Sequence, residues 1–136
     1  LGLYPGTPEH LRQLTDAGLR LALASSADRI KVDANLRVAG IPAGWFAVLL
    51  SAEDVQQKKP HPEIYATAAA RLSLPPEQCV VVEDAVNGIC AAKAAGMRCF
   101  AMTTTFASAE LKKAGADFIA ANLGEVCREI LNNLRA

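Results

Sequence analysis

Residues 79–89 read CVVVEDAVNGI and join a short apolar run to two adjacent carboxylates and the start of a helical pattern. The apolar run has the length and the β-branched content of a buried strand. Glu83 and Asp84 follow it directly, and the helical pattern begins at Ala85. In an open α/β sheet, ligands are held at the carboxyl ends of the strands, and Mg²⁺ prefers oxygen ligands such as carboxylates. The stretch therefore predicts a parallel strand that ends in a metal-binding acidic pair.

The same alternation of apolar runs and amphipathic segments continues along the chain. The expected strands are 19–24, 46–50, 79–82, 98–102 and 117–119; the expected helices are 7–17, 28–39, one from Pro62, 85–95, a short one around 111–114, and 123–134. The side chains expected to face inward include Ile30, Ala34 and Val38 in one helix and Leu123, Val126, Cys127, Ile130, Leu131 and Leu134 in the last. Helices that alternate with apolar strands predict an α/β fold with a Rossmann-like parallel sheet.

Composition excludes several classes of protein. The chain has 136 residues, of which 51% are hydrophobic, so we expect one domain over residues 1–136 with a substantial core. The net charge is zero and the basic residues are scattered, which argues against nucleic-acid binding. No apolar run approaches the roughly 18 residues of a spanning helix, which argues against membrane insertion. Four widely spaced cysteines are expected to be buried thiols of a protein in a reducing compartment.

Polar side chains also follow earlier apolar runs. Ser25 and Ser26 come directly after residues 19–24, and Lys59 precedes a proline in a later loop. Taken singly, each has an ordinary structural alternative: the serines cap a helix, the lysine lies in a solvated loop, and Asp84 caps the helix after it. Because the carboxyl ends of parallel strands share one edge of the sheet, these positions are expected to converge. A hydroxyl, helix-terminal amides, an ammonium and an acidic pair together favour phosphoryl chemistry.

In this order, the motifs resemble those of the haloacid dehalogenase-like (HAD) hydrolase superfamily, in the branch that contains β-phosphoglucomutase and phosphoglycolate-phosphatase-like enzymes. Residues 59–65 (KPHPEIY) resemble the third motif of the superfamily, and residues 82–89 (VEDAVNGI) resemble the fourth. Pro5-Gly6 and residues 21–25 (LALAS) resemble the return from a cap domain into the second motif. The resemblance covers nearly the whole chain and implies the HAD core, with helices on both faces of the sheet.

The resemblance also implies roles for individual residues. Ser25 and Ser26 would contact the phosphate, and Lys59 would steady the phosphate and the attacking nucleophile, so Ser25 and Lys59 are the expected catalytic side chains. Asp84 would bind Mg²⁺ directly, and Glu83 would bind it directly or through water. The reaction implied is hydrolysis or transfer of the phosphoryl group of a small phosphorylated metabolite through an aspartyl-phosphate.

One motif of the superfamily is missing. Its first motif, D-x-D-x-T/V, ends an N-terminal strand and supplies the nucleophilic aspartate, and no D-x-D occurs in this sequence. The sequence begins at Leu1 without a methionine. We therefore expect residues 1–136 to be the C-terminal portion of a HAD core that lacks the first strand and the cap. That strand would lie between the strands that end at Ser25 and Glu83, and its absence would expose two strand edges. The chain alone is then expected to be inactive and to need the N-terminal strand and cap, or another polypeptide, as a partner.

Other interpretations remain open from the sequence. The missing nucleophile also fits a non-catalytic HAD-like module used for binding or assembly. A receiver-like domain fits poorly, because it needs an acidic pair on an early strand. Residues 24–29 (ASSADR) and 31–36 (KVDANL) are similar to the HAD domain of plant and algal suppressor-of-quenching proteins. That similarity implies a multidomain protein located in the chloroplast stroma. Without it, the expected location is the cytoplasm.

Overall fold

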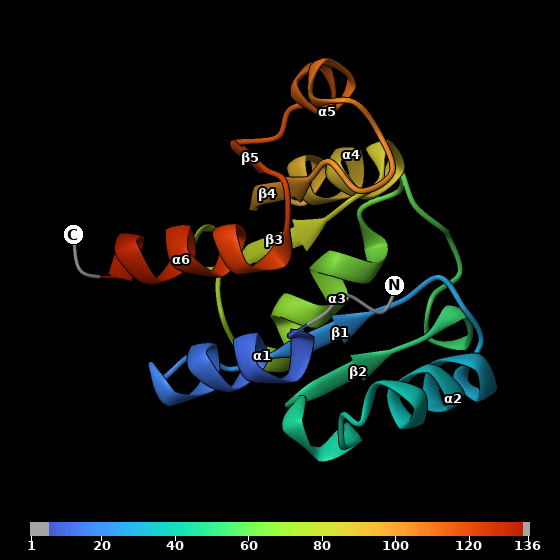
Figure 1. Ribbon diagram of the computed structural model, residues 1–136. Coiled ribbons are helices and arrows are strands. Elements are labelled where there is room, and N and C mark those ends of the chain that lie inside the picture. Colours follow the sequence, from blue (N-terminus) through green and yellow to red (C-terminus); the bar gives the residue numbers. More distant parts are fainter. Residues whose placement is uncertain (1–5, 135–136) are drawn as a thin grey trace.

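The computed structural model describes residues 6–134, in which helices and strands alternate (Figure 1). The helices are α1 (Thr7–Asp16), α2 (Arg29–Ala39), α3 (Glu63–Leu72), α4 (Val86–Ala94), α5 (Ser108–Ala114) and α6 (Leu123–Leu134). The strands are β1 (Ala22–Ala24), β2 (Val48–Leu50), β3 (Val80–Glu83), β4 (Arg98–Met102) and β5 (Phe118–Ala120). Three short 3₁₀ helices lie between them, η1 (Ala43–Trp45), η2 (Ala52–Asp54) and η3 (Pro76–Gln78). The order matches the sequence prediction, although Pro5 of the expected cap-return motif lies outside the described residues.

All strand pairs in this part of the chain are parallel, as the alternating pattern predicted, but they form two separate sheets. β1 pairs with β2, with Ala24 opposite Leu50. β4 lies between β3 and β5, with Glu83 opposite Ala101. Among the described residues, β1 and β3 do not pair with each other, so each is an edge strand of its own sheet (Figure 1). The break lies where the resemblance placed the first strand of the superfamily.

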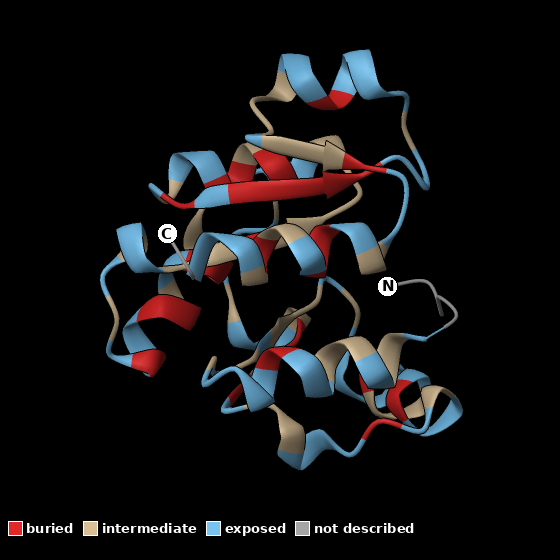
Figure 2. Cartoon of the chain, turned by 60° about the vertical axis from the view of Figure 1, so that its left-hand side comes forward, coloured by how far each residue is buried: buried red, intermediate tan, exposed pale blue. Residues whose placement is uncertain are grey.

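Helices cover both faces and join the two sheets. α3 packs against β1, β2 and α4, while α6 packs against β4, β5 and α1. Successive side chains of a strand point to opposite faces, and β4 supplies both cores in this way. Cys99 and Ala101 belong to the core with α3 and α4, whereas Phe100 and Met102 belong to the core with α1 and α6. β4 is accordingly buried over most of its length (Figure 2).

Three side chains that we expected to face inward are exposed. Ile30 is 82% exposed and Val38 is 73% exposed, because α2 buries the opposite stripe, Val32 and Leu36. Both stripes carry apolar residues at helical spacing, so the periodicity alone selected the wrong one. Leu134 is 50% exposed because it is the last residue of α6. The remaining expected positions of α6 are buried or partly buried.

The four cysteines are free thiols. The expectation that all are buried is correct for Cys99 and Cys127 but wrong for Cys79 and Cys90, which are partly exposed. Burial raises the pKa of Cys99 to about 12 and that of Cys127 to about 11. None of the helices in residues 6–134 is long and apolar enough to cross a membrane.

Candidate functional site

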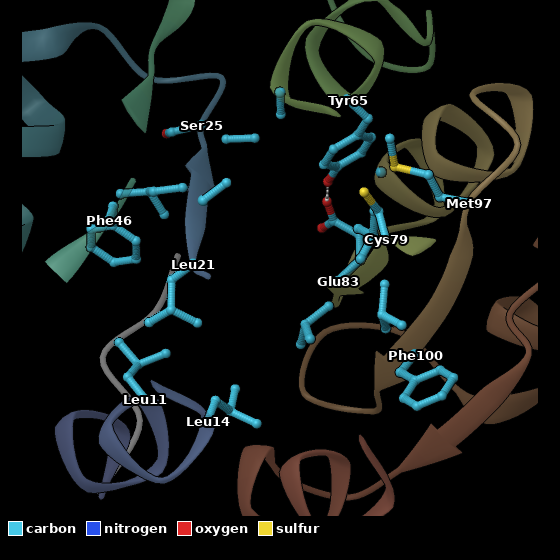
Figure 3. Close-up of a pocket in the computed structure, with 18 of the residues that line it drawn as sticks. Leu11, Leu14, Leu21, Ser25, Phe46, Tyr65, Cys79, Glu83, Met97 and Phe100 are labelled. Carbon is cyan, nitrogen blue, oxygen red and sulfur yellow. Dashed lines mark hydrogen bonds between the residues drawn. The ribbon is translucent and has the colours of Figure 1, made fainter. Parts of the chain in front are cut away.

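A cavity of about 840 Å³ lies between the facing edges of β1 and β3. Ser25, which follows β1, lines one wall, and Glu83, the last residue of β3, lines the other (Figure 3). Lys59 and Asp84 line the same cavity. Most of the remaining lining is apolar, including Leu21 and Phe100 (Figure 3). The polar residues predicted from the sequence therefore line one cavity from two sides, with Ser25 on the side of β1 and Glu83 on the side of β3.

Lys59 and Glu83 form an ion pair at this edge. The Nζ atom of Lys59 lies 3.0 Å from Oε2 of Glu83, and the two side chains are only 15% and 11% exposed. Lys59 leaves the loop just before a cis peptide bond to Pro60, whereas Glu83 ends β3. The neighbouring Lys58 is exposed. The structure thus distinguishes the two lysines, because Lys59 pairs with Glu83 whereas Lys58 is exposed.

Tyr65 was not assigned a role from the sequence, yet it is the closest partner of Glu83. Its hydroxyl donates a 2.5 Å hydrogen bond to Oε2 of Glu83 (Figure 3). Burial, together with the nearby Glu83 carboxylate, raises the pKa of Tyr65, so the hydroxyl keeps its proton and acts as a donor. Tyr65 is the last residue of the KPHPEIY stretch and lies on the buried face of α3, but an apolar ring would satisfy that buried position equally well.

The second oxygen of the Glu83 carboxylate faces the start of α4. Oε1 accepts hydrogen bonds from the backbone N–H groups of Asp84, at 3.1 Å, and Ala85, at 3.4 Å. Gly88 makes room for this carboxylate, because a Cβ atom at residue 88 would lie 2.0 Å from both Cδ and Oε2 of Glu83. The alternative in which Asp84 caps α4 is wrong: Ala85 is the N-cap residue, without a side-chain cap, and Glu83 accepts the nearby N–H groups.

Asp84 lies against the loop after β4. Its Oδ2 atom accepts a 2.9 Å hydrogen bond from the Thr105 hydroxyl and a longer one, 3.4 Å, from Thr104. These threonines were missed in the sequence because they follow a strand without a recognisable motif around them. They hold the Asp84 carboxylate at the lining of the cavity.

Ser25 lies on the opposite wall from this cluster. Its backbone N–H continues the β1–β2 ladder by donating to the Leu50 carbonyl, and its Oγ accepts a 3.1 Å hydrogen bond from the Ala27 N–H. The helix-capping alternative is wrong for both serines, because the cap of α2 is Asp28, whose carboxylate accepts from the Lys31 N–H. Ser25 is partly exposed and Ser26 is exposed. The turn closed by the hydrogen bond between the Ala27 N–H and the Ser25 hydroxyl therefore borders the cavity and is not part of the α2 cap.

The acidic pair has the chemistry that Mg²⁺ requires. Mg²⁺ is commonly held by one or two carboxylates, with waters and substrate phosphates completing an octahedron. Glu83 and Asp84 contribute two carboxylates to the lining of the cavity. Residues 6–134 contain no group of three or more His, Cys, Asp or Glu side chains placed to hold a metal. The acidic pair thus supplies at most part of a Mg²⁺ ligand set, and the remaining ligands would have to come from outside these residues.

Comparisons with known proteins agree with this architecture. Residues 1–96 match the family described as haloacid dehalogenase-like hydrolase. The chain is 46% identical over 123 residues to the Arabidopsis thaliana protein SUPPRESSOR OF QUENCHING 1, chloroplastic, covering 90% of this chain and 12% of that protein. It is 39% identical over 121 residues to validoxylamine A 7'-phosphate phosphatase of Streptomyces hygroscopicus subsp. limoneus, covering 89% of this chain and 55% of that protein.

A solved structure shares the fold over nearly the whole chain. It is that of a HAD family hydrolase from Deinococcus radiodurans R1 with bound phosphate and sodium. Its TM-score is 0.88 at 31% identity, and the match covers 95% of this chain and 59% of that one. This chain thus spans little more than half the length of that hydrolase and of the Streptomyces phosphatase.

The fold and the strand-end cluster define a parallel α/β domain with a cluster of charged side chains beside a cavity at its carboxyl edge. The comparisons make this assignment specific, and the chain belongs to the haloacid dehalogenase-like hydrolase family.

Proposed function

We propose that this chain is the core portion of a Mg²⁺-dependent phosphatase or phosphomutase that acts on a small phosphorylated metabolite through an aspartyl-phosphate. The nucleophilic aspartate would lie outside residues 1–136. The observation that carries the proposal is the arrangement of Lys59, Glu83 and Asp84 at one wall of a cavity with Ser25 at the other. Relatives named as phosphatases support the same chemistry.

The site residues of this chain would have different roles around the phosphate. Ser25, with Ser26, would donate hydrogen bonds to phosphate oxygens, and the ammonium of Lys59 would offset negative charge on the phosphate and on the nucleophile. Asp84 would hold Mg²⁺ directly, with Glu83 bound directly or through water. When bound, the metal would supply positive charge that stabilises the transferring phosphoryl group.

The partner required by this proposal is an extended strand. β1 and β3 are both parallel strands, and their facing edges border the cavity. A strand placed between them would complete the backbone hydrogen bonding of both edges and bring its carboxyl end between Ser25 and Lys59. We propose that the N-terminal strand of the full-length protein takes this place and carries the nucleophile, with a cap domain covering the site.

A non-catalytic HAD-like module is the second candidate function. The observation that favours it is the absence of D-x-D from the sequence. The two candidates differ in what they require of the strand between β1 and β3, because only the enzyme needs an aspartate at its end.

For location, we propose the chloroplast stroma or the cytoplasm. The chloroplastic relative supports the first, and the four free thiols are compatible with a reducing compartment.

The test is Mg²⁺-dependent phosphate release by the full-length protein and its variants. Lys59→Ala and Asp84→Asn should each lower kcat/KM at least a hundredfold while the protein stays folded, because each removes a charge that faces the phosphate or the metal. Lys113→Ala is the control, since this exposed lysine of α5 does not line the cavity and should leave kcat/KM within about twofold of wild type. Near-normal activity in a folded Lys59→Ala or Asp84→Asn variant would contradict the role proposed for that residue.

A further inference from the structure

We propose that Tyr65, Glu83 and Gly88 form a positioning cluster that fixes the Lys59 ammonium beside the cavity. This inference rests on the proposed function, because it explains how the chain would hold the cation that faces the phosphate. Tyr65 and Gly88 are positioning residues in this account, since they would act through Glu83 and Lys59, whereas Glu83 also belongs to the proposed Mg²⁺ site.

Glu83 contributes a carboxylate whose two oxygens are both engaged. Oε2 accepts from Lys59 and Tyr65, and Oε1 accepts from two backbone N–H groups at the start of α4. The two backbone hydrogen bonds fix the Glu83 carboxylate relative to α4, and the hydrogen bond from Tyr65 fixes it relative to α3. Lys59 therefore pairs with an anion that is held from two sides.

Tyr65 also contacts Lys59 directly. The Nζ atom of Lys59 lies 4.9 Å from the centre of the Tyr65 ring, within the range of a cation–π interaction. The ammonium thus lies between an aromatic ring and a carboxylate, and both are held by the same hydroxyl–carboxylate hydrogen bond. A lysine side chain has high rotamer entropy, and these contacts restrict it to one position beside the cavity.

Gly88 leaves the space that the Glu83 carboxylate occupies. Any side chain at residue 88 would meet the Glu83 carboxylate, because even a Cβ atom would lie 2.0 Å from its Cδ and Oε2 atoms. The atoms in conflict are at the far end of a flexible side chain, so the carboxylate would turn away and α4 would persist. Gly88→Ala is therefore expected to displace Glu83 from Lys59 without touching Lys59 itself.

The test combines a chemical readout on Lys59 with kinetics, in the full-length protein. An amine-reactive ester is applied briefly to the folded protein, and mass spectrometry measures labelling of Lys59 relative to Lys58, an exposed internal control on the same loop. Wild type should show a low Lys59:Lys58 ratio. Tyr65→Phe, which keeps the ring and removes only the hydroxyl, should raise the ratio severalfold, and so should Gly88→Ala.

The kinetic readout separates positioning from general folding. Misplacing a catalytic group by about 1 Å can cost about a hundredfold in rate, so Tyr65→Phe should lower kcat tenfold or more and leave KM nearly unchanged. An unchanged labelling ratio in folded Tyr65→Phe and Gly88→Ala would overturn the positioning cluster. A raised ratio with normal kcat would overturn its link to catalysis. If wild-type protein releases no phosphate, the proposed function fails, and the labelling ratio alone decides whether Lys59 is held by this cluster.

Discussion

Gly88→Ala offers a measure of how tightly the Glu83 carboxylate is held. The new Cβ atom would lie 2.0 Å from Cδ and Oε2 of Glu83, so the carboxylate must leave its place. It would then lose hydrogen bonds from Tyr65 and Lys59, and hydrogen bonds to charged groups contribute about 1.5–3 kcal/mol each. In opposition, alanine stabilises a helix interior over glycine by roughly 0.5–1 kcal/mol. The expected result is a net loss of about 2–5 kcal/mol in the free energy of unfolding.

A double-mutant cycle isolates this effect. In a Glu83→Ala background the obstructing atoms are absent, so adding Gly88→Ala should stabilise the protein by roughly 0.5–1 kcal/mol. Urea unfolding of the full-length protein measures each corner of the cycle. Gly44→Ala is a matched control, because a Cβ atom there meets nothing within 4 Å, and it should change stability by less than about 0.5 kcal/mol. The reasoning is refuted if Gly88→Ala stabilises the protein equally whether or not Glu83 is present.

Two further predictions concern the rest of the fold. Cys99 and Cys127 are buried, and burial raises their pKa values to about 12 and about 11. Neither thiol should therefore react with a disulfide reagent at pH 8 until the protein unfolds. Rapid labelling of either thiol in the native protein would show that the core opens locally. Burial tends to raise the pKa of Asp117, but hydrogen bonds from Lys93 and from the Cys99 N–H outweigh it and hold the pKa below its ordinary value. Because the folded pKa is the lower one, the stabilisation exists above the unfolded pKa of about 3.9 and disappears as the pH falls through the folded value. Because the Asp117 side chain is 36% exposed, Asp117→Asn should lower the free energy of unfolding by only about 0.5–1 kcal/mol at pH 7. The loss, measured by urea unfolding, should become progressively smaller below pH 4. A loss that grows on acidification would contradict this account.

Much of the architecture could be predicted because the relevant patterns are local. Alternating apolar runs and helical periodicity gave the order of elements, and proline and glycine marked their ends. The choice of face on α2 could not be predicted, since Ile30 and Val38 form as good a helical stripe as Val32 and Leu36, and only tertiary packing selects between them. Periodicity defines stripes, whereas contacts with other elements decide which stripe is buried.

The candidate site, like the fold, could be predicted from the sequence only in part. The loop that carries Lys59 and the acidic pair after β3 could be placed at the same edge, because topology brings the carboxyl ends of parallel strands to one edge. Tyr65 and Gly88 could not be found in this way. Their roles depend on the direction of the Tyr65 hydroxyl and on the path of the Glu83 side chain across α4, and neither follows from sequence spacing.

The central claim is that this chain supplies one half of a phosphoryl-transfer site and that a strand between β1 and β3 supplies the nucleophile. Hydrolysis of p-nitrophenyl phosphate with Mg²⁺ tests it most directly, using the purified chain alone and the chain mixed with the N-terminal segment of the full-length protein. The chain alone should show no turnover, because covalent catalysis needs a nucleophile, and mixing should produce turnover that Asp84→Asn abolishes. Turnover by the chain alone that survives rigorous purification would contradict the claim.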